Sequence, residues 1–352
     1  MKKKALKDFK HTALIQTAFL GDVVLTLPLV QAIKEINPDI KITFVTTPAA
    51  ASIVRLADAV DNVIVYDKRG GQSGFGGISF MAASLHDLGV DVVISPHRSL
   101  RTTTISKITR THTVGFDKNA MSFLYSATVK YKPHLHEIKR NLSLLSAFSD
   151  TPDYIDNLPV PKITIPESDN EKINGLLKEN GVEDDDKIVV LAPGSVWATK
   201  KWTEEGSADL TVLLKKAGYT PVLIGAESDQ PICDRIKEKS QCLSFAGITS
   251  LPQTLALMKK ARLAVTNDSA PTHFAGLGRC PVVTIFGATA TIFGFGPIGQ
   301  FDRVVQNEEL KCRPCAIHGQ NQCPVGTFEC MKSISAERVF EECNKSLSAT
   351  TL

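Results

Sequence analysis

The sequence predicts an α/β protein built from two doubly wound, Rossmann-like domains. Short apolar runs that have the character of buried strands alternate with stretches of helical spacing in both halves of the chain. Such alternation predicts parallel sheets covered by helices on both faces. A Pro- and Asp-rich stretch at residues 149–169 predicts a linker between the halves. The 352 residues also fit two domains of about 150 residues each.

The apolar runs give the elements in order. In the first half, strands are predicted at residues 12–16, 41–46, 62–66 and 90–95, with a helix at residues 23–36. In the second half, strands are predicted at residues 187–192, 220–225, 263–265 and 280–287, with helices at residues 202–217, 251–261 and 274–278. Ser335 predicts the cap of a closing helix at residues 336–347. The predicted domains are therefore residues 1–165 and 166–352.

Composition and charge narrow the classes of function. With 43% hydrophobic and 22% charged residues and no apolar run near the roughly 20 residues of a membrane span, we expect a cytoplasmic protein. Residues 1–165 carry 20 Lys and Arg against 14 Asp and Glu, whereas residues 166–352 carry 20 against 23. The basic half suits an anionic partner at a membrane surface, although an ordinary solvated surface explains it equally well. The basic residues are scattered, which argues against nucleic-acid binding.

The most informative turn follows the predicted strand at residues 263–265. It places Asp268, Ser269, Ala270 and His273 immediately before and inside a helix of small residues. Ligands of parallel sheets bind at the carboxyl ends of strands, where helix N-termini attract anions. We expect Asp268 to hold sugar hydroxyls, and the backbone N–H groups of Ser269 and Ala270, with His273, to face phosphates.

A loop with two tryptophans follows the first strand of the second domain and contains Lys200 and Lys201. A lysine held there could neutralise a diphosphate and stabilise charge on a departing nucleotide. The alternative is two solvated lysines. Ser195 and Thr199 could add hydroxyl contacts to a donor, and Asp229, in an acidic turn after the next strand, could hold ribose hydroxyls.

In the first domain, Gly21 and Asp22 lie between a strand and a helix. Asp22 could cap the helix, a common role that contributes about 1 kcal/mol. It could instead act as a general base on an incoming hydroxyl. The stretch is not a dinucleotide fingerprint, because only one glycine is present.

Together, three segments resemble the ADP-heptose:lipopolysaccharide heptosyltransferases of glycosyltransferase family 9. They are Gly21-Asp22-Val23, the loop from Pro193 to Trp202, and Asn267 to His273, and the resemblance extends from Thr12 to about Ser346. It implies a GT-B fold, in which two domains face a central cleft. It also implies an inverting transfer of heptose from ADP-heptose that requires no metal or other cofactor.

The resemblance also assigns roles. Asp22 matches the general base, Lys200 the lysine facing the donor phosphates, and Asp268 the acid that contacts the heptose, while Asp229 falls where a ribose-binding acid is expected. The family usually has glycine where this chain has Ala270. If that position required a positive φ, alanine would cost about 1 kcal/mol.

His97, Arg98 and Arg101 follow the fourth strand of the first domain and look like the acceptor-side loop of the family. The resemblance implies an anionic glycolipid acceptor, lipid A with its inner core, met at the cytoplasmic face of the inner membrane. A basic loop without a ligand is the alternative.

Three other functions fit the same residues. The chain could be a nucleotide-sugar epimerase or hydrolase, a transferase that uses another nucleotide sugar, or a silent nucleotide-sugar binding module. An epimerase turns over with donor alone, and a binding module shows no turnover and needs no base. The sequence identifies neither the acceptor, Kdo or heptose or another sugar, nor the donor sugar.

Four cysteines near the end of the chain have the spacing of a metal site. Cys312, Cys315, Cys323 and Cys330 lie in a loop rich in Pro and Gly, which a structural zinc could close. Disulfides are disfavoured in a reducing cytoplasm. Members of the family often carry cysteines here, which implies a structural role and no part in transfer.

Overall fold

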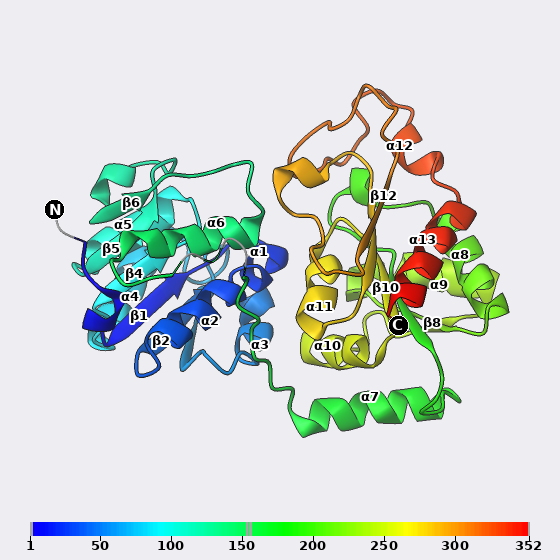
Figure 1. Ribbon diagram of the computed structural model, residues 1–352, viewed down its shortest axis with the longest axis horizontal. Coiled ribbons are helices and arrows are strands. Elements are labelled where there is room, and N and C mark those ends of the chain that lie inside the picture. Colours follow the sequence, from blue (N-terminus) through cyan, green and yellow to red (C-terminus); the bar gives the residue numbers. More distant parts are fainter. Residues whose placement is uncertain (1–2, 153, 155–156, 351–352) are drawn as a thin grey trace. The chain divides into compact units, whose positions relative to one another are not determined.

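The computed structural model describes residues 3–152, 154 and 157–350. The chain divides into two compact units, Met1–Thr164 and Ile165–Leu352 (Figure 1). Each unit contains one six-stranded parallel sheet with its own helices, which confirms the predicted α/β class. Residues 153, 155 and 156 of the predicted linker lie outside the described residues. The end of that predicted linker is helical instead, because a helix begins at Glu167 after Pro166.

The sheet of the first unit has the strand order β3-β2-β1-β4-β5-β6, with every neighbouring pair parallel. This is the strand order of a Rossmann sheet. Successive strands are added on one side of β1 up to β3 and on its other side from β4 onward, so the order reverses between β1 and β4 while all strands stay parallel. Every residue of β1 is buried, as expected of a central strand covered on both faces. The strands are β1 (His11–Ile15), β2 (Lys41–Thr46), β3 (Asn62–Val65), β4 (Val92–Ser95), β5 (His112–Phe116) and β6 (Ala127–Val129).

The helix predicted at residues 23–36 is two helices, α1 and α2, separated by Leu25 and Thr26. Pro28 lies in the first turn of α2, where its missing N–H breaks no helical hydrogen bond. The helices of this unit are α1 (Leu20–Val24), α2 (Leu27–Ile36), α3 (Ala51–Val54), α4 (Gly74–Asp87), α5 (Leu100–Ile108) and α6 (Glu137–Ser143). Short 3₁₀ turns occupy Leu6–Asp8, Pro48–Ala50, Ser122–Leu124 and Leu144–Ala147.

The sheet of the second unit has the order β12-β11-β10-β7-β8-β9, again parallel throughout. Counted from its own first strand, β7, this is the same Rossmann order, with the reversal between β7 and β10. The strands are β7 (Ile188–Ala192), β8 (Thr220–Leu223), β9 (Leu243–Ser244), β10 (Leu263–Asn267), β11 (Val282–Phe286) and β12 (Arg303–Gln306).

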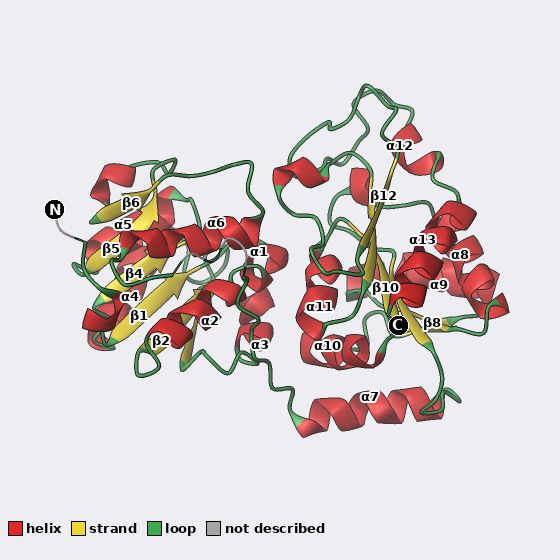
Figure 2. Ribbon diagram, in the orientation of Figure 1, coloured by secondary structure: helices red, strands yellow, loops and turns green. Residues whose placement is uncertain are grey.

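Helices flank this second sheet as well (Figure 2). Among them α8 packs against α9 and α13, and α10 packs against α7 and α11. Ser335 accepts a hydrogen bond from the backbone N–H of Arg338 and caps α13, as predicted. The helices are α7 (Glu167–Glu179), α8 (Glu204–Lys216), α9 (Gln230–Ser240), α10 (Leu251–Lys260), α11 (Ala270–Gly278), α12 (Glu329–Lys332) and α13 (Ala336–Ala349). The 3₁₀ turns are η5 (Ala198–Lys200), η6 (Glu227–Asp229) and η7 (Thr291–Phe293).

None of the helices described in either unit is long and apolar enough to cross a membrane. The polar turns singled out in the sequence follow β1 and β4 in the first unit, and β7, β8 and β10 in the second. They therefore lie at the carboxyl edges of the two sheets, on either side of each reversal point.

Candidate active site

The turn after β10 builds one end of the candidate site. Asn267 is the last residue of β10, Ser269 is the N-cap of α11 in extended backbone, and the helix begins at Ala270 with proline in its first turn. Ala270 is not among the residues with positive φ. Alanine therefore fits this position without strain, and the departure from the glycine of the family leaves the helix N-terminus intact.

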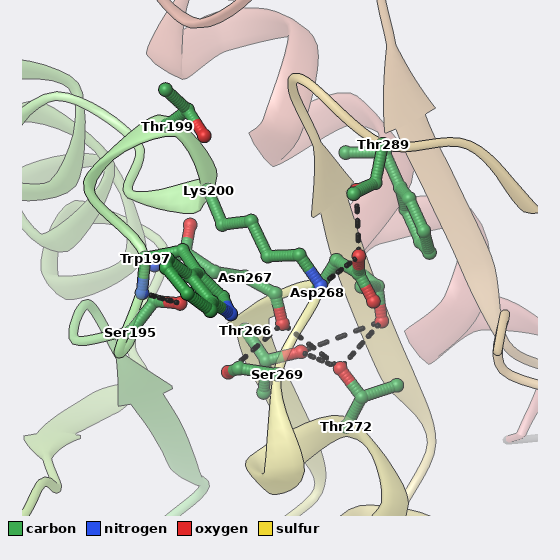
Figure 3. Close-up of polar contacts among 12 residues, drawn as sticks. Ser195, Trp197, Thr199, Lys200, Thr266, Asn267, Asp268, Ser269, Thr272 and Thr289 are labelled. Carbon is green, nitrogen blue, oxygen red and sulfur yellow. Dashed lines mark hydrogen bonds and ion pairs between the residues drawn. The ribbon is translucent and has the colours of Figure 1, made fainter. Parts of the chain in front are cut away.

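Lys200 and Asp268 form a largely buried ion pair at this turn (Figure 3). The Lys200 Nζ lies 2.7 Å from the Asp268 Oδ2, and the two side chains are 13% and 7% exposed. The hydroxyl of Thr289 donates to the same oxygen at 2.6 Å. Because these residues follow β7, β10 and β11, three adjacent strands contribute to one polar cluster.

Asn267 ties the two loops of this cluster together. Its side-chain oxygen accepts a hydrogen bond from the Trp202 backbone N–H at 3.0 Å, and its amide donates to the Pro193 carbonyl at 2.8 Å. The Trp202 indole in turn donates to the Ile334 carbonyl at 3.0 Å. Asn267 is 2% exposed, so both bonds lie away from water. This side chain holds the lysine loop against the end of β10.

The other predicted donor residues lie on the same edge of the sheet. Asp229 packs so closely over two glycines that an added Cβ would lie 2.3 Å from its carboxyl carbon at Gly194 and 2.7 Å from its Cβ at Gly225. One carboxylate oxygen of Asp229 accepts from the Ala226 backbone N–H at 3.1 Å. Both glycines are therefore needed for Asp229 to sit over the ends of β7 and β8.

The hydroxyls of this region already have partners within the protein. Thr199 both donates to the Gln320 carbonyl and accepts from the Gln320 N–H, at 3.0 and 2.8 Å. Ser195 accepts from the Trp197 N–H at 3.4 Å, and Ser269 donates to the Asn267 carbonyl at 3.3 Å. His273 lies half-buried in the second turn of α11. Lys201 lies near Glu204. The pKa of Glu204 is lowered mainly by its hydrogen bond with Arg235, and the charges of Lys239 and Lys201 add smaller contributions.

In the first unit, Asp22 lies in the first turn of α1, directly after β1. One oxygen accepts from the Phe19 backbone N–H at 3.2 Å, so the capping contact is present. Asp22 also lies close to Glu137 of α6. Burial is the main cause that raises the pKa of Glu137, and the negative charge of Asp22 adds to it, while Arg140 and Arg98 act in the opposite direction.

Positive side chains gather at the end of β4. Burial lowers the pKa of His97 to about 4, and the charges of Lys68 and Arg98 add to the shift. The Nδ1 of His97 lies 3.0 Å from the Thr17 hydroxyl. Burial also lowers the pKa of Lys68, and the positive charges of Arg69 and Arg101 add to this shift. The Lys68 ammonium donates a hydrogen bond to the Thr17 carbonyl.

The two predicted arginines of this loop are anchored within the same unit. Arg101 donates to the Lys68 carbonyl at 2.9 Å, and the exposed Arg98 guanidinium stacks 3.9 Å from the centroid of the Tyr131 ring. The sequence analysis named His97, Arg98 and Arg101 but not Lys68, which comes from the segment after β3 and lies beside them. No local pattern marks Lys68, because its neighbours in this cluster are distant in the sequence.

The four cysteines of the predicted metal site are free thiols. In the described part of the chain, no group of three or more His, Cys, Asp or Glu side chains is placed to hold a metal ion. The thiol of Cys315 donates to the Cys312 carbonyl at 3.0 Å, and the sulfur of Cys323 accepts from the Phe328 N–H at 3.4 Å. Burial raises the pKa of Cys330 to about 11. These four cysteines form no such group among the described residues, so the zinc site stays a prediction from spacing.

Comparison with known proteins identifies what this arrangement resembles. The family model for glycosyltransferase family 9 (heptosyltransferase) matches residues 81–325. Lipooligosaccharide heptosyltransferase 2 of Haemophilus influenzae is 24% identical over 55% of this chain, and the match spans only 58% of that relative. Lipooligosaccharide heptosyltransferase 2 of Campylobacter jejuni is 25% identical over 95% of this chain and 97% of its own.

A solved structure shares the fold. The ADP-heptose lipopolysaccharide heptosyltransferase II of Escherichia coli superposes with a TM-score of 0.78 at 18% identity, over 97% of this chain and 100% of that one. The likeness confirms the predicted fold of two Rossmann-like sheets.

Proposed function

The chain belongs to glycosyltransferase family 9, the heptosyltransferases, and from this premise we propose that it transfers heptose from ADP-heptose to a sugar hydroxyl of the lipopolysaccharide inner core. The observation that carries the proposal is the buried cluster of Lys200, Asp268 and Thr289 at the ends of three adjacent strands. It supplies a cation, a carboxylate and a helix N-terminus at one place, which is what a diphosphate sugar requires.

At the donor end, we propose that the diphosphate lies against the Lys200 ammonium and the N-terminus of α11. An incoming phosphate would share the ammonium that Asp268 now holds at 2.7 Å. The Asp268 carboxylate would then accept hydrogen bonds from heptose hydroxyls. Lys200 and the helix N–H groups would stabilise the negative charge that develops on ADP as it leaves.

At the acceptor end, we propose that the Asp22 carboxylate removes the proton of the acceptor hydroxyl. The hydroxyl oxygen forms a bond to the anomeric carbon as the bond from that carbon to the ADP oxygen breaks, which inverts the configuration. The capping contact with Phe19 uses Oδ2 and would orient the carboxylate. The charge of Arg98 and Lys68 near His97 supports an anionic acceptor on this side.

An acceptor built on lipid A implies contact with a membrane surface. We propose that the protein meets this acceptor at the cytoplasmic face of the inner membrane. The excess of six positive charges in residues 1–165, 20 Lys and Arg against 14 Asp and Glu, supports this.

A structural zinc at the four cysteines is a separate proposal that the spacing alone supports. No step of the transfer depends on it. Metal analysis of the purified protein tests it directly, and a protein without bound zinc after purification under reducing conditions would contradict it.

The test of function is a donor screen with core-truncated lipopolysaccharide as acceptor. We expect ADP release from ADP-heptose that requires the acceptor, and little release from GDP- or UDP-sugars. Release without acceptor would indicate a hydrolase, and conversion of the donor sugar alone an epimerase.

Replacement of the proposed base separates chemistry from binding. We expect Asp22→Asn to reduce kcat by a factor of 100 or more, in the range of general-base catalysis, while ADP affinity measured by calorimetry stays within twofold. Asparagine can still accept the capping bond from the Phe19 N–H, so loss of ADP binding together with activity would show that the charge of Asp22 serves the fold and not the chemistry.

A further inference from the structure

A nine-residue stretch of the cysteine loop, residues 312–320, contacts the lysine loop directly; we call it the brace segment. Three hydrogen bonds join Thr199 to Gln320, two through the Thr199 hydroxyl and one from the Thr199 N–H to the Gln320 carbonyl at 3.0 Å. Thr199 is 2% exposed and immediately precedes Lys200. The brace segment therefore fixes the backbone on which Lys200 stands.

Gly319 brings the brace segment against the Lys200 side chain itself. Its φ is +82°, and an added Cβ would lie 2.9 Å from the Trp197 Cβ and 3.1 Å from the Lys200 Cγ. Contacts this short force a neighbour to shift. The aliphatic part of the Lys200 side chain thus lies against Gly319, in space that a side chain at residue 319 would need.

The brace segment also reaches the carboxylate half of the ion pair. The Arg313 guanidinium donates to the Thr289 carbonyl at 2.8 Å and to the Gly287 carbonyl at 2.5 Å. The Cys315 N–H donates to the Ala288 carbonyl at 2.7 Å. These bonds hold the segment after β11, whose Thr289 hydroxyl donates to Asp268. One segment is therefore bonded to both sides of the Lys200–Asp268 pair.

We propose that the brace segment positions the phosphate-binding lysine, with Thr199, Gly319 and Arg313 as positioning residues that do not touch the substrate. This inference rests on the proposed function, since it requires Lys200 to face the donor diphosphate. It gives the Thr199 hydroxyl a role within the protein in place of the donor contact predicted from the sequence. It also gives the cysteine loop a function at the donor site that needs no metal.

Two glycines of the cysteine loop provide a matched test. Gly319→Ala and Gly326→Ala both place alanine at a positive φ, +82° and +75°, but an added Cβ at Gly326 has no atom within 4 Å. Backbone strain is therefore common to both variants, and only Gly319→Ala pushes on Trp197 and Lys200. ADP and adenosine affinities of both variants are measured by calorimetry, with the melting temperature of each.

We expect Gly319→Ala to weaken ADP at least tenfold and adenosine less than twofold, because the displaced group is the phosphate-binding ammonium. It should also raise the KM for the donor sugar and leave the KM for the acceptor unchanged. Gly326→Ala should lower the melting temperature similarly and leave ADP affinity within twofold. Equal ADP affinities in the two variants, or equal losses for ADP and adenosine, would overturn the proposal.

Lys200→Met distinguishes failure of this inference from failure of the function on which it rests. If Lys200→Met leaves ADP affinity unchanged, Lys200 does not bind the phosphates and the proposed donor site is wrong. If Lys200→Met weakens ADP and Gly319→Ala does not, only the brace is wrong. Thr199→Val, which removes both hydroxyl bonds, should reproduce the loss of ADP affinity, and Thr199→Ser should restore it.

Discussion

At the scale of single residues, the ion pair between Lys200 and Asp268 determines how the side chains of the proposed donor site are held. A buried ammonium without a partner is strongly unfavourable, and Asp268 supplies the partner for Lys200 at 2.7 Å. The Thr289 hydroxyl satisfies the same carboxylate. Because an ammonium has three N–H donors, a ligand phosphate can share the Lys200 ammonium while Asp268 keeps its contact, and the pair keeps the site ordered before the donor binds.

His97 makes the stability of the protein depend on pH. Its folded pKa of about 4 lies below the ordinary value of 6.5, so the unfolded chain binds the proton more tightly. The stabilising contribution of neutral His97 is complete above pH 6.5 and declines as the pH falls towards 4. We expect wild type to lose up to about 1.4 kcal/mol per pH unit through this residue, and His97→Asn to lack that loss.

Urea unfolding at pH 7, 6 and 5 measures the difference between the two proteins. His112, whose pKa burial also lowers, is common to both and cancels. Parallel stability curves for wild type and His97→Asn would show that His97 titrates normally in the folded state.

Residues that lie in a polar turn could be predicted from the sequence, whereas residues that reach a site from elsewhere could not. Asp22, Lys200 and Asp268 each follow an apolar strand, which marks the carboxyl edge of a sheet. Arg313 and Lys68 meet their partners only through folding, and nothing in the sequence around them indicates those partners.

At the scale of elements, strands with a continuous apolar run were predictable, including the edge strand β3, whereas short strands and strands of mixed composition were not. β7 and β10 are wholly buried and stand out as apolar runs. β9 has two residues, and β12 begins with Arg303 and is mostly half-buried, so neither has a clear pattern. β5 and β6 were missed as well, and β6 has only three residues.

Asn267 links the lysine loop to the end of β10, whereas a helix cap stabilises only its own helix. The two kinds of contact should therefore differ in their effect on ADP affinity. Asn267→Ala leaves the Trp202 N–H and the Pro193 carbonyl without their buried partner. We expect it to lower the free energy of unfolding by about 2 kcal/mol or more and to weaken ADP, because the lysine loop is released from β10. Calorimetry with ADP and urea unfolding provide the two readings.

Ser335→Ala is the control for this change. It removes the cap of α13 and should lower the free energy of unfolding by about 1 kcal/mol without changing ADP affinity. If both variants left ADP affinity unchanged, Asn267 would serve stability alone.

At the scale of the whole molecule, the two halves of the chain have sheets of identical strand order but opposite net charge. Residues 1–165 have a formal excess of six positive charges and residues 166–352 an excess of three negative charges. Shared topology therefore does not dictate shared partners. The basic half carries the cluster around His97, and the acidic half carries the Lys200–Asp268 pair, in which the cation is already neutralised.

This asymmetry predicts salt-sensitive attraction to anionic membranes. We expect the protein to sediment with vesicles that contain anionic phospholipid at low salt, and to be released at about 0.5 M salt, where the screening length falls to a few ångströms. Neutral vesicles are the control and should bind little at any salt concentration. Binding that is equal on neutral and anionic vesicles, or that persists at high salt, would show that the attraction does not come from the basic half. The proposed acceptor is anchored in the membrane by its lipid. That outcome would therefore also show that the positive charges of residues 1–165 do not bring the protein to its acceptor.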